Sequence, residues 1–163
     1  MSKAKRKLPP VSFYFAVKLL GVTKRNKSQF DAEFQEISGI TAELEFEEIK
    51  EGGENRFSHR VPGRVKYDNL VLKRGLVIWP SEFGNWCKDT LTTTPGEDQR
   101  WIERRDINVY LMNRHQNKSE PIRTWSFVNA IPSKWEISNF NSQESNLAME
   151  TITFSYQYFS IVK

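Results

Sequence analysis

The sequence predicts a mainly β protein: an antiparallel β-barrel or sandwich with one packed α-helix and a long extended hairpin. Three observations lead to this fold class. Aromatic residues, which favour strands, make up 13% of the 163 residues. Apolar and polar residues alternate in several segments, which is typical of half-buried strands. Helical spacing, by contrast, is convincing in a single segment. A chain of this length can bury a core as one domain.

The N-terminal segment is strongly basic. Residues 1–28 carry eight bases and no acid, while the net charge of the whole chain is +4. We expect residues 1–10 to form a flexible basic arm and residues 11–163 to form a single β domain. The arm either contacts phosphates or an acidic partner, or is simply solvated.

The first two predicted strands follow this arm. In residues 13–19 and 30–34 the apolar side chains occupy every second position, and Ser38–Gly39 ends the second strand. Each of these strands is expected to bury one face and to expose the other.

The next segment divides into an acidic strand and a basic strand. Residues 41–54 hold six acids and one base, and residues 55–75 hold six bases and one acid. A narrow hairpin buries little, so a charge division of this kind indicates a surface that docks on another protein. The predicted docking residues are Glu43, Glu45, Glu47, Glu48, Glu51, Gly52, Gly53, Glu54, Asn55, Arg56, His59, Arg60 and Arg64.

The hairpin also has a predicted register. Gly52–Gly53 permits positive φ at the tip. With the turn centred there, Arg60 falls opposite Glu45. Pro62–Gly63 is expected to end the pairing because proline has no N–H to donate.

A short strand over residues 67–73 precedes the single predicted helix. Ser81 is a suitable N-cap, and the apolar positions that follow have helical spacing. Glu82 near the start and Lys88 near the end suit the helix dipole. The residues expected on the packed face are Phe83, Trp86, Cys87, Thr90 and Leu91.

Three strands complete the predicted fold. Residues 107–112 and 122–128 form two of them, joined by a polar loop, with Trp125 and Phe127 on one face. The last strand covers residues 151–158, where strict alternation places Tyr156 and Tyr158 in the core rather than on a base-binding surface.

Candidate chemistry is sparse. His59 and His115 have no second ligand at metal spacing, and Cys87 occupies an apolar helix position typical of an inert buried thiol. The exposed glutamates of the hairpin are expected to be solvated or paired with arginine. We therefore predict no enzyme, no metal and no cofactor. We also expect no signal peptide, and no segment approaches the length of a membrane span.

Seven short motifs then occur in a fixed order along most of the chain. Together they resemble the inner tube proteins of contractile phage tails and of extracellular contractile injection systems. The motifs are Phe34–Ile40 (FQEISGI), Glu51–Asn55 (EGGEN), Val61–Gly63 (VPG), Lys66–Gly75 (KYDNLVLKRG), Arg105–Ile107 (RDI), Trp125–Trp135 (WSFVNAIPSKW) and Met149–Ile152 (METI).

This resemblance implies a tail-tube-like subunit that forms hexameric rings. Stacked rings would make a hollow tube, which a contractile sheath drives through a target envelope. The hairpin would reach a neighbouring subunit or ring. The implied partners are adjacent rings, sheath and baseplate or spike proteins, with protein or DNA as lumenal cargo and no membrane insertion. The implied location is cytoplasmic during assembly, then an extracellular or virion tail-like particle.

Two alternatives stay open. The segment Pro9–Phe15 with its basic tail is more similar to the baseplate-proximal tube variants than to the repeating subunit, so the chain is either a tube initiator or a main tube subunit of a phage tail. A nucleic-acid-binding β module is the alternative from a different class, motivated by the basic N-terminus and the aromatic content. A small hydrolase is a third possibility, but no set of catalytic residues in the sequence supports it.

Overall fold

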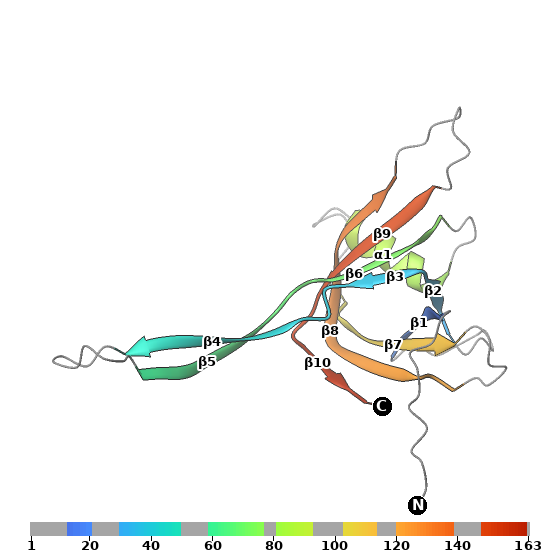
Figure 1. Cartoon of the computed structure of the whole chain (residues 1–163). Helices are drawn as coiled ribbons and strands as arrows, with labels where there is room; N and C mark the ends of the chain where they lie inside the picture. Colours follow the sequence, from blue (N-terminus) through green and yellow to red (C-terminus); the bar gives the residue numbers. More distant parts are fainter. Residues whose placement is uncertain are drawn as a thin grey trace, which may run out of the picture.

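The computed structural model describes residues 13–20, 30–49, 59–76, 81–92, 103–113, 120–138 and 148–162. Ten strands and one helix form in these residues, which confirms the mainly β class with one packed helix (Figure 1). In chain order they are β1 (Phe13–Leu19), β2 (Ala32–Phe34), β3 (Glu36–Ser38), β4 (Ala42–Ile49), β5 (His59–Tyr67), β6 (Leu70–Gly75), α1 (Glu82–Thr92), β7 (Arg105–Asn113), β8 (Arg123–Ile137), β9 (Met149–Ser155) and β10 (Tyr158–Ile161).

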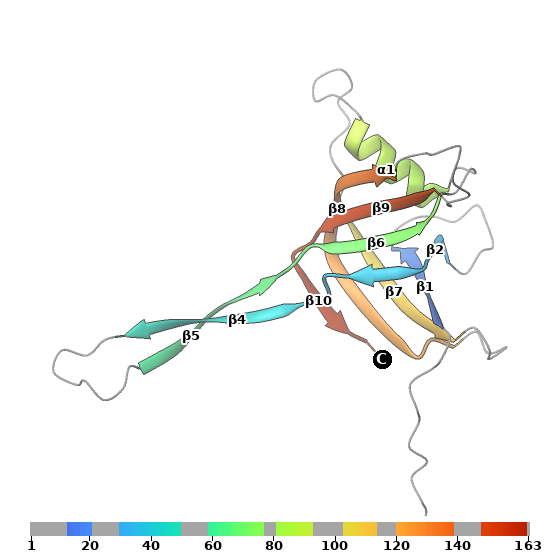
Figure 2. The same ribbon diagram turned by 45° about the horizontal axis from the view of Figure 1, so that its top comes forward.

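Eight of these strands form one antiparallel sheet, in the order β2-β1-β7-β8-β9-β6-β3, with β10 paired to β8 beside this path. The sheet is strongly curved (Figure 2). Its two end strands, β2 and β3, are separated in the chain only by Gln35, whose N–H donates to the Lys73 carbonyl of β6 at 2.9 Å. No ladder joins β2 to β3 among the described residues, so the curved sheet is not a closed barrel.

The longest strand, β8, joins the two halves of this sheet. Residues 123–130 pair with β7, and residues 131–137 pair with β9. The sequence predicted a strand over residues 122–128, and the structure extends it through Asn129 and Pro132, two residues typical of turns. The structure accommodates both. Asn129 has a φ of 53° and its N–H donates to the Asp106 carboxylate at 2.9 Å, and a register shift follows Pro132.

The core lies on the concave side of the sheet. Its largest fully buried side chains are the phenylalanines Phe34, Phe83, Phe127 and Phe154. The Trp86 ring stacks on Phe154 with ring centroids 5.8 Å apart, and the Phe83 ring of the helix lies 5.7 Å from the Phe154 ring, tilted by 54°. Burial of large aromatic surfaces is the main source of stability in a domain of this kind.

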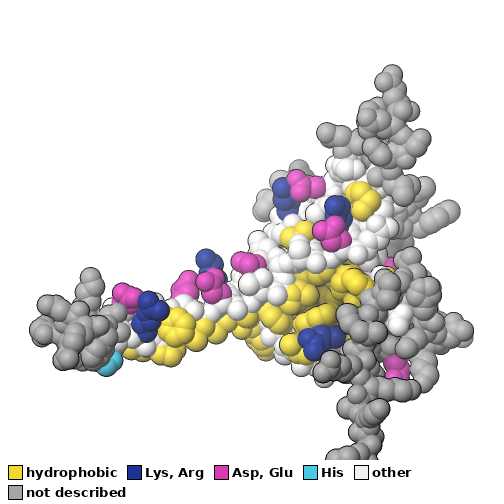
Figure 3. All heavy atoms as spheres, in the orientation of Figure 1, with side chains coloured by type: hydrophobic (Ala, Val, Ile, Leu, Met, Phe, Trp, Pro, Cys, Tyr) yellow, Lys and Arg dark blue, Asp and Glu magenta, His cyan; other side chains and the backbone are white. Residues whose placement is uncertain are grey.

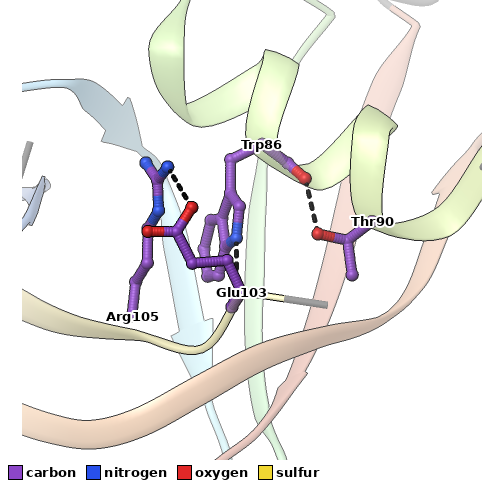
Figure 4. Close-up of polar contacts among 4 residues, drawn as sticks. All are labelled: Trp86, Thr90, Glu103 and Arg105. Atoms are coloured by element: carbon purple, nitrogen blue, oxygen red, sulfur yellow. Dashed lines mark hydrogen bonds and ion pairs between the residues drawn. The ribbon is translucent and has the colours of Figure 1, made fainter. Parts of the chain in front are cut away.

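Helix α1 begins where the sequence predicted. The Gly84 N–H donates to Ser81 Oγ at 3.0 Å, which confirms the N-cap, and Phe83, Trp86 and Cys87 are buried. The helix is fixed to the sheet by polar contacts as well (Figure 4). The Trp86 indole N–H donates to the Glu103 carbonyl at 3.0 Å, and Arg105 lies over the Trp86 ring while pairing with the Glu103 carboxylate.

A buried ion pair joins β6, β9 and the helix. Arg74 Nε donates to Glu150 Oε2 at 2.5 Å, and both side chains are less than a tenth exposed. The guanidinium also lies 5.0 Å from the centroid of the Phe34 ring and 5.9 Å from that of Phe83. These contacts compensate for the cost of burying both charges and hold the helix and the edge strand β2 on the sheet.

The final predicted strand is interrupted. Tyr156 and Gln157 separate β9 from β10, so the alternation of buried and exposed side chains does not continue from one strand into the next. Tyr156 is half-buried as predicted, but Tyr158 is 47% exposed and Phe159 packs against the core in its place. The prediction that Tyr158 belongs to the core is therefore wrong, because two residues outside the ladder change which side of the chain faces inward.

Candidate assembly surface

Strands β4 and β5 form a hairpin that projects from the body of the molecule (Figure 1). They pair only with each other, as a separate two-stranded sheet. All eight residues of β4 are exposed, and so are all residues of β5 except Tyr67. A two-stranded ribbon is only marginally stable by itself in water. The hairpin is therefore the part of the described structure that most needs a partner.

The base of the hairpin is anchored on the end of the sheet. The Tyr67 ring lies 6.0 Å from Tyr156 and 5.7 Å from Phe159, centroid to centroid. The Tyr156 hydroxyl donates to the Gly39 carbonyl at 3.4 Å, and burial raises the pKa of Tyr156 to about 12. Gly39 has a φ of +83°, and a Cβ there would lie 1.8 Å from the Asn69 carbonyl oxygen. The turn into the hairpin therefore requires glycine.

The hairpin contains a β-bulge. Leu44 pairs with Val65 and Phe46 pairs with Pro62, so Gly63 and Arg64 together oppose Glu45. The prediction that Pro62–Gly63 ends the pairing is wrong. The ladder continues past it to Tyr67, because a bulge accommodates a residue that has no N–H to give.

The bulge leaves one side of the hairpin apolar near the body. Residues that pair across an antiparallel ladder lie on the same face, so Leu44 and Val65 share a face, and the paired Phe46 and Pro62 extend it. Leu44 is 42% exposed, Phe46 56% and Val65 47%. We call this surface the apolar face; its residues are Ala42, Leu44, Phe46, Pro62, Val65 and Tyr67. Figure 3 shows hydrophobic side chains that continue from the hairpin onto an adjoining hollow of the body.

The opposite side, which we call the charged face, carries Glu43, Glu45, Glu47, Arg64 and Lys66. Glu43 pairs directly with Lys66 across the strands, so the glutamates of β4 lie beside the bases of β5 on this face. The predicted partner of Arg60 was Glu45; in the structure Arg60 pairs with Glu48, with Nη2 3.3 Å from Oε1. The prediction failed because the regular ladder from Phe46 to Ile49 is offset by three residues from the register that a turn centred on Gly52–Gly53 would give. Exposed ion pairs of this kind contribute about 0–1 kcal/mol.

The predicted docking residues fall into two groups. Glu43, Glu45, Glu47, Glu48, His59, Arg60 and Arg64 are exposed on the hairpin, while Glu51, Gly52, Gly53, Glu54, Asn55 and Arg56 lie outside the described residues. The sequence reasoning missed the apolar face. Its signal is present in the alternation of Leu44 and Phe46 with Glu43, Glu45 and Glu47.

The structure also locates the candidate chemical groups. Cys87 is fully buried, and burial raises the pKa of its thiol to about 12, as expected for an inert thiol. His59 is exposed on β5, and His115 lies outside the described residues. In the described part of the chain, no group of three potential ligands could hold a metal ion. No helix there has the length and apolar character needed to span a membrane.

Comparisons with known proteins agree with this geometry. The family model described as T4-like virus tail tube protein gp19 matches residues 11–160. A chain of the anti-feeding prophage (AFP) baseplate, solved by cryo-EM with 6-fold symmetry, is 25% identical with a TM-score of 0.74, covering 96% of this chain and 97% of that one. A search of curated proteins gave no match.

Two further cryo-EM structures share the fold. A chain of the PVC sheath–tube complex, an extracellular contractile injection system in the extended state, is 20% identical with a TM-score of 0.70, covering 96% of this chain and 92% of that one. A chain of the AFP tube terminating cap is 19% identical with a TM-score of 0.72, covering 98% and 95%. The match over residues 11–160 shows that this chain belongs to the T4-like tail tube protein family.

Proposed function

We propose that this chain is a structural subunit of the inner tube of a contractile injection machine. Copies of it form hexameric rings, and the rings stack into a hollow conduit. The proposal rests on the hairpin, which forms a separate two-stranded sheet with an exposed apolar face. Contact with a second copy of the chain would cover that face. Family membership and the 6-fold symmetry of the AFP baseplate relative support six copies in a ring.

Within this machine, the tube-initiating ring at the baseplate is the position we favour. The support is that the AFP baseplate chain is 25% identical, whereas the PVC sheath–tube chain is 20% identical. The repeating main tube subunit is the alternative position. In either case the partners are adjacent rings, sheath and baseplate or spike proteins, and the lumen carries protein or DNA. The subunit has a structural role and is not an enzyme. It assembles in the cytoplasm and becomes part of an extracellular or virion particle.

The direct test is electron microscopy of the purified full chain, alone and mixed with its tube and baseplate neighbours. The proposal predicts rings with six-fold symmetry that stack or dock on the baseplate. A chain that stays monomeric at high concentration, and forms no ring with these neighbours, would contradict it. Binding assays with single-stranded nucleic acid test the alternative function. A nucleic-acid-binding module would bind at low salt, and its affinity would fall steeply as the salt concentration rises.

The charged face has its own test. Reversal of Glu43, Glu45 and Glu47 to Lys places like charges opposite Arg64 and Lys66, on a surface that the body does not contact. We expect the thermal stability of the body to be unchanged and ring formation to be impaired. Normal rings from this variant would exclude a docking role for these glutamates. The variant Leu44→Ser/Phe46→Ser would then show whether ring formation depends on the apolar face.

A further inference from the structure

The change of partners along β8 divides the curved sheet into two halves. The first half holds β1, β2, β7, β10 and residues 123–128 of β8, and the second half holds β3, β6, β9 and residues 131–137. Between them lies Asn129, which has a φ of 53° and is the one described non-glycine residue with a positive φ. Asparagine enters this left-handed conformation more readily than most residues. Strand β8 therefore passes from one half to the other through a residue of special backbone conformation.

The side chain of Asp106 holds Asn129 in this conformation. The register of β7 on β8 shifts at Asp106, so that Val128 and Asn129 together oppose it as a β-bulge. The Asn129 N–H donates to Asp106 Oδ1 at 2.9 Å, and the Asp106 carbonyl accepts the Leu20 N–H at 2.9 Å. A hydrogen bond to a carboxylate is stronger than one to a neutral acceptor. Asp106 thus bonds both to β8 and to the residue that follows β1.

The break between β9 and β10 is bonded to the same place. Asn129 Nδ2 donates to Gln157 Oε1 at 2.8 Å, and the Gln157 N–H donates to the Val128 carbonyl at 3.0 Å. Asn129 therefore bonds to Asp106 through its backbone and to Gln157 through its side chain. We call Asp106, Asn129 and Gln157 the corner, because they join three strands at the point where the two halves of the sheet meet.

The corner is connected to the base of the hairpin through Tyr156. This residue directly precedes Gln157, and its ring lies 4.9 Å from that of Phe127 and 6.0 Å from that of Tyr67, centroid to centroid. Its hydroxyl donates to the Gly39 carbonyl. Gly39 precedes β4 and Tyr67 ends β5. Tyr156 therefore contacts the chain at both points where the hairpin leaves the body.

The base of the hairpin also contacts both halves of the sheet. The Tyr67 ring lies 5.7 Å from Phe159 of β10, which is in the first half, whereas β3 and β6, which lead into the hairpin, are in the second half. A change in the angle between the halves would therefore tilt the hairpin. Strand β4 has eight residues and extends about 26 Å, so a tilt of about 10° moves its far end by about 5 Å.

We infer that the corner is a positioning device. Its hydrogen bonds fix the angle between the two halves of the sheet, and with it the direction in which the hairpin leaves the body. The device lies within a single chain. Its consequence for assembly rests on the proposed function, because a closed ring requires every copy to present its contact surfaces at the same angle.

Distances within one chain test this device. Spin labels on Ser160→Cys and Lys134→Cys report the angle between the halves, and labels on Ser160→Cys and Glu47→Cys report the direction of the hairpin; all three positions are exposed. Doubly labelled chains are diluted into an excess of unlabelled chains, so that only distances within one chain are measured, in rings or in monomers. The parent chain controls for labelling of the buried Cys87.

Substitution of Asp106 is the first comparison. Asp106→Ala removes the acceptor of the Asn129 N–H, whereas Asp106→Asn keeps an oxygen that accepts it. We expect Asp106→Ala to broaden both distance distributions, by about 5 Å for the hairpin pair, and to reduce ring formation. Asp106→Asn should reproduce the parent. Distributions as narrow in Asp106→Ala as in the parent would overturn the inference.

Ser81→Ala is a matched control, because it also removes one hydrogen bond but lies at the start of the helix. It should lower thermal stability and leave both distance distributions unchanged. Broadening in Ser81→Ala equal to that in Asp106→Ala would overturn the inference, because the distances would then follow general stability rather than the corner.

Substitution of Gln157 decides the question if Asp106→Ala does not fold, because Gln157 is exposed. Gln157→Leu removes the oxygen that accepts the Asn129 amide, and Gln157→Glu keeps it. We expect Gln157→Leu to broaden the distances between the labels on Ser160→Cys and Glu47→Cys, and Gln157→Glu to leave them unchanged. If both variants match the parent, the corner does not position the hairpin. Narrow distances in a parent chain that forms no rings would contradict the proposed function and not the positioning device.

Discussion

The body and the hairpin of this chain use the same alternating pattern with opposite results. In β6 the residues alternate between buried and half-buried, because one side packs on the core of the same chain. In β4 apolar and acidic residues also alternate, yet all eight residues are exposed. The difference shows that alternation predicts a strand with one apolar side, but does not predict whether that side contacts its own chain or another. Substitutions in the two regions should therefore affect different properties.

The largest effect on stability is expected in the core of the body. Phe154 is fully buried and its ring contacts those of Trp86 and Phe83. Phe154→Ala should lower the free energy of unfolding by about 4 kcal/mol, through lost burial and the cavity left behind. Urea denaturation followed by tryptophan fluorescence measures this change. A loss below about 1 kcal/mol would contradict the description of the helix packed on β9.

The next largest effect is expected at the buried ion pair. Arg74→Met keeps an unbranched apolar stem between Phe34 and Phe83 but leaves the Glu150 carboxylate buried without its cation. We expect a loss of about 3 kcal/mol, as for other buried pairs that lose one partner. The double variant Arg74→Met/Glu150→Leu is the control and should recover much of that loss. If the single and double variants are equally destabilised, the pairing is not what stabilises this site.

A smaller effect is expected at the start of the helix. Ser81→Ala removes the oxygen that accepts the Gly84 N–H. This change should lower stability by about 1 kcal/mol, whereas Ser81→Asp should keep the cap and add a favourable charge near the helix N-terminus. Thermal unfolding of the two variants side by side makes the comparison. An unchanged midpoint for Ser81→Ala would show that the cap contributes nothing to the body.

The smallest effect on stability is expected in the hairpin. Phe46 is a large apolar residue, but it is 56% exposed and contacts no part of the body core. Phe46→Ser should change the free energy of unfolding by less than about 0.5 kcal/mol, as is usual for exposed positions. The same urea titration as for Phe154→Ala checks it. A loss as large as that at Phe154 would show that the apolar face is covered by its own chain.

Much of the body could be predicted from the sequence because its signals are local. The alternation in β1 and β7, the Ser81 cap and the spacing of Phe83 and Trp86 depend on near neighbours in the chain. What could not be predicted depends on long-range geometry. Asn129 and Pro132 are typical of turns, yet they lie within β8, where Asp106 and a register shift accommodate them.

The sequence predicted the position of the hairpin in the chain, but not its apolar face or its bulge. The charge division identified the hairpin, and the family resemblance gave it a role. The bulge at Gly63–Arg64 changes which residues face each other, and no local signal specifies it. The break between β9 and β10 likewise turns Tyr158 outward and exposes an edge. The bulge is a one-residue shift in the β4–β5 ladder, whereas the break in the last strand lies opposite Asn129 of β8 and keeps its register. Both features depend on pairing between distant segments.

The central claim is that the body folds alone and the apolar face of the hairpin drives assembly. Analytical ultracentrifugation of the wild type, of Leu44→Ser/Phe46→Ser and of Ile137→Ser tests it most directly. Ile137 is a matched control, because it is 44% exposed on β8 in the body. The account predicts ring-sized species for the wild type and for Ile137→Ser, and folded monomers for the hairpin variant. Ring-sized species in undiminished amount from Leu44→Ser/Phe46→Ser would contradict it.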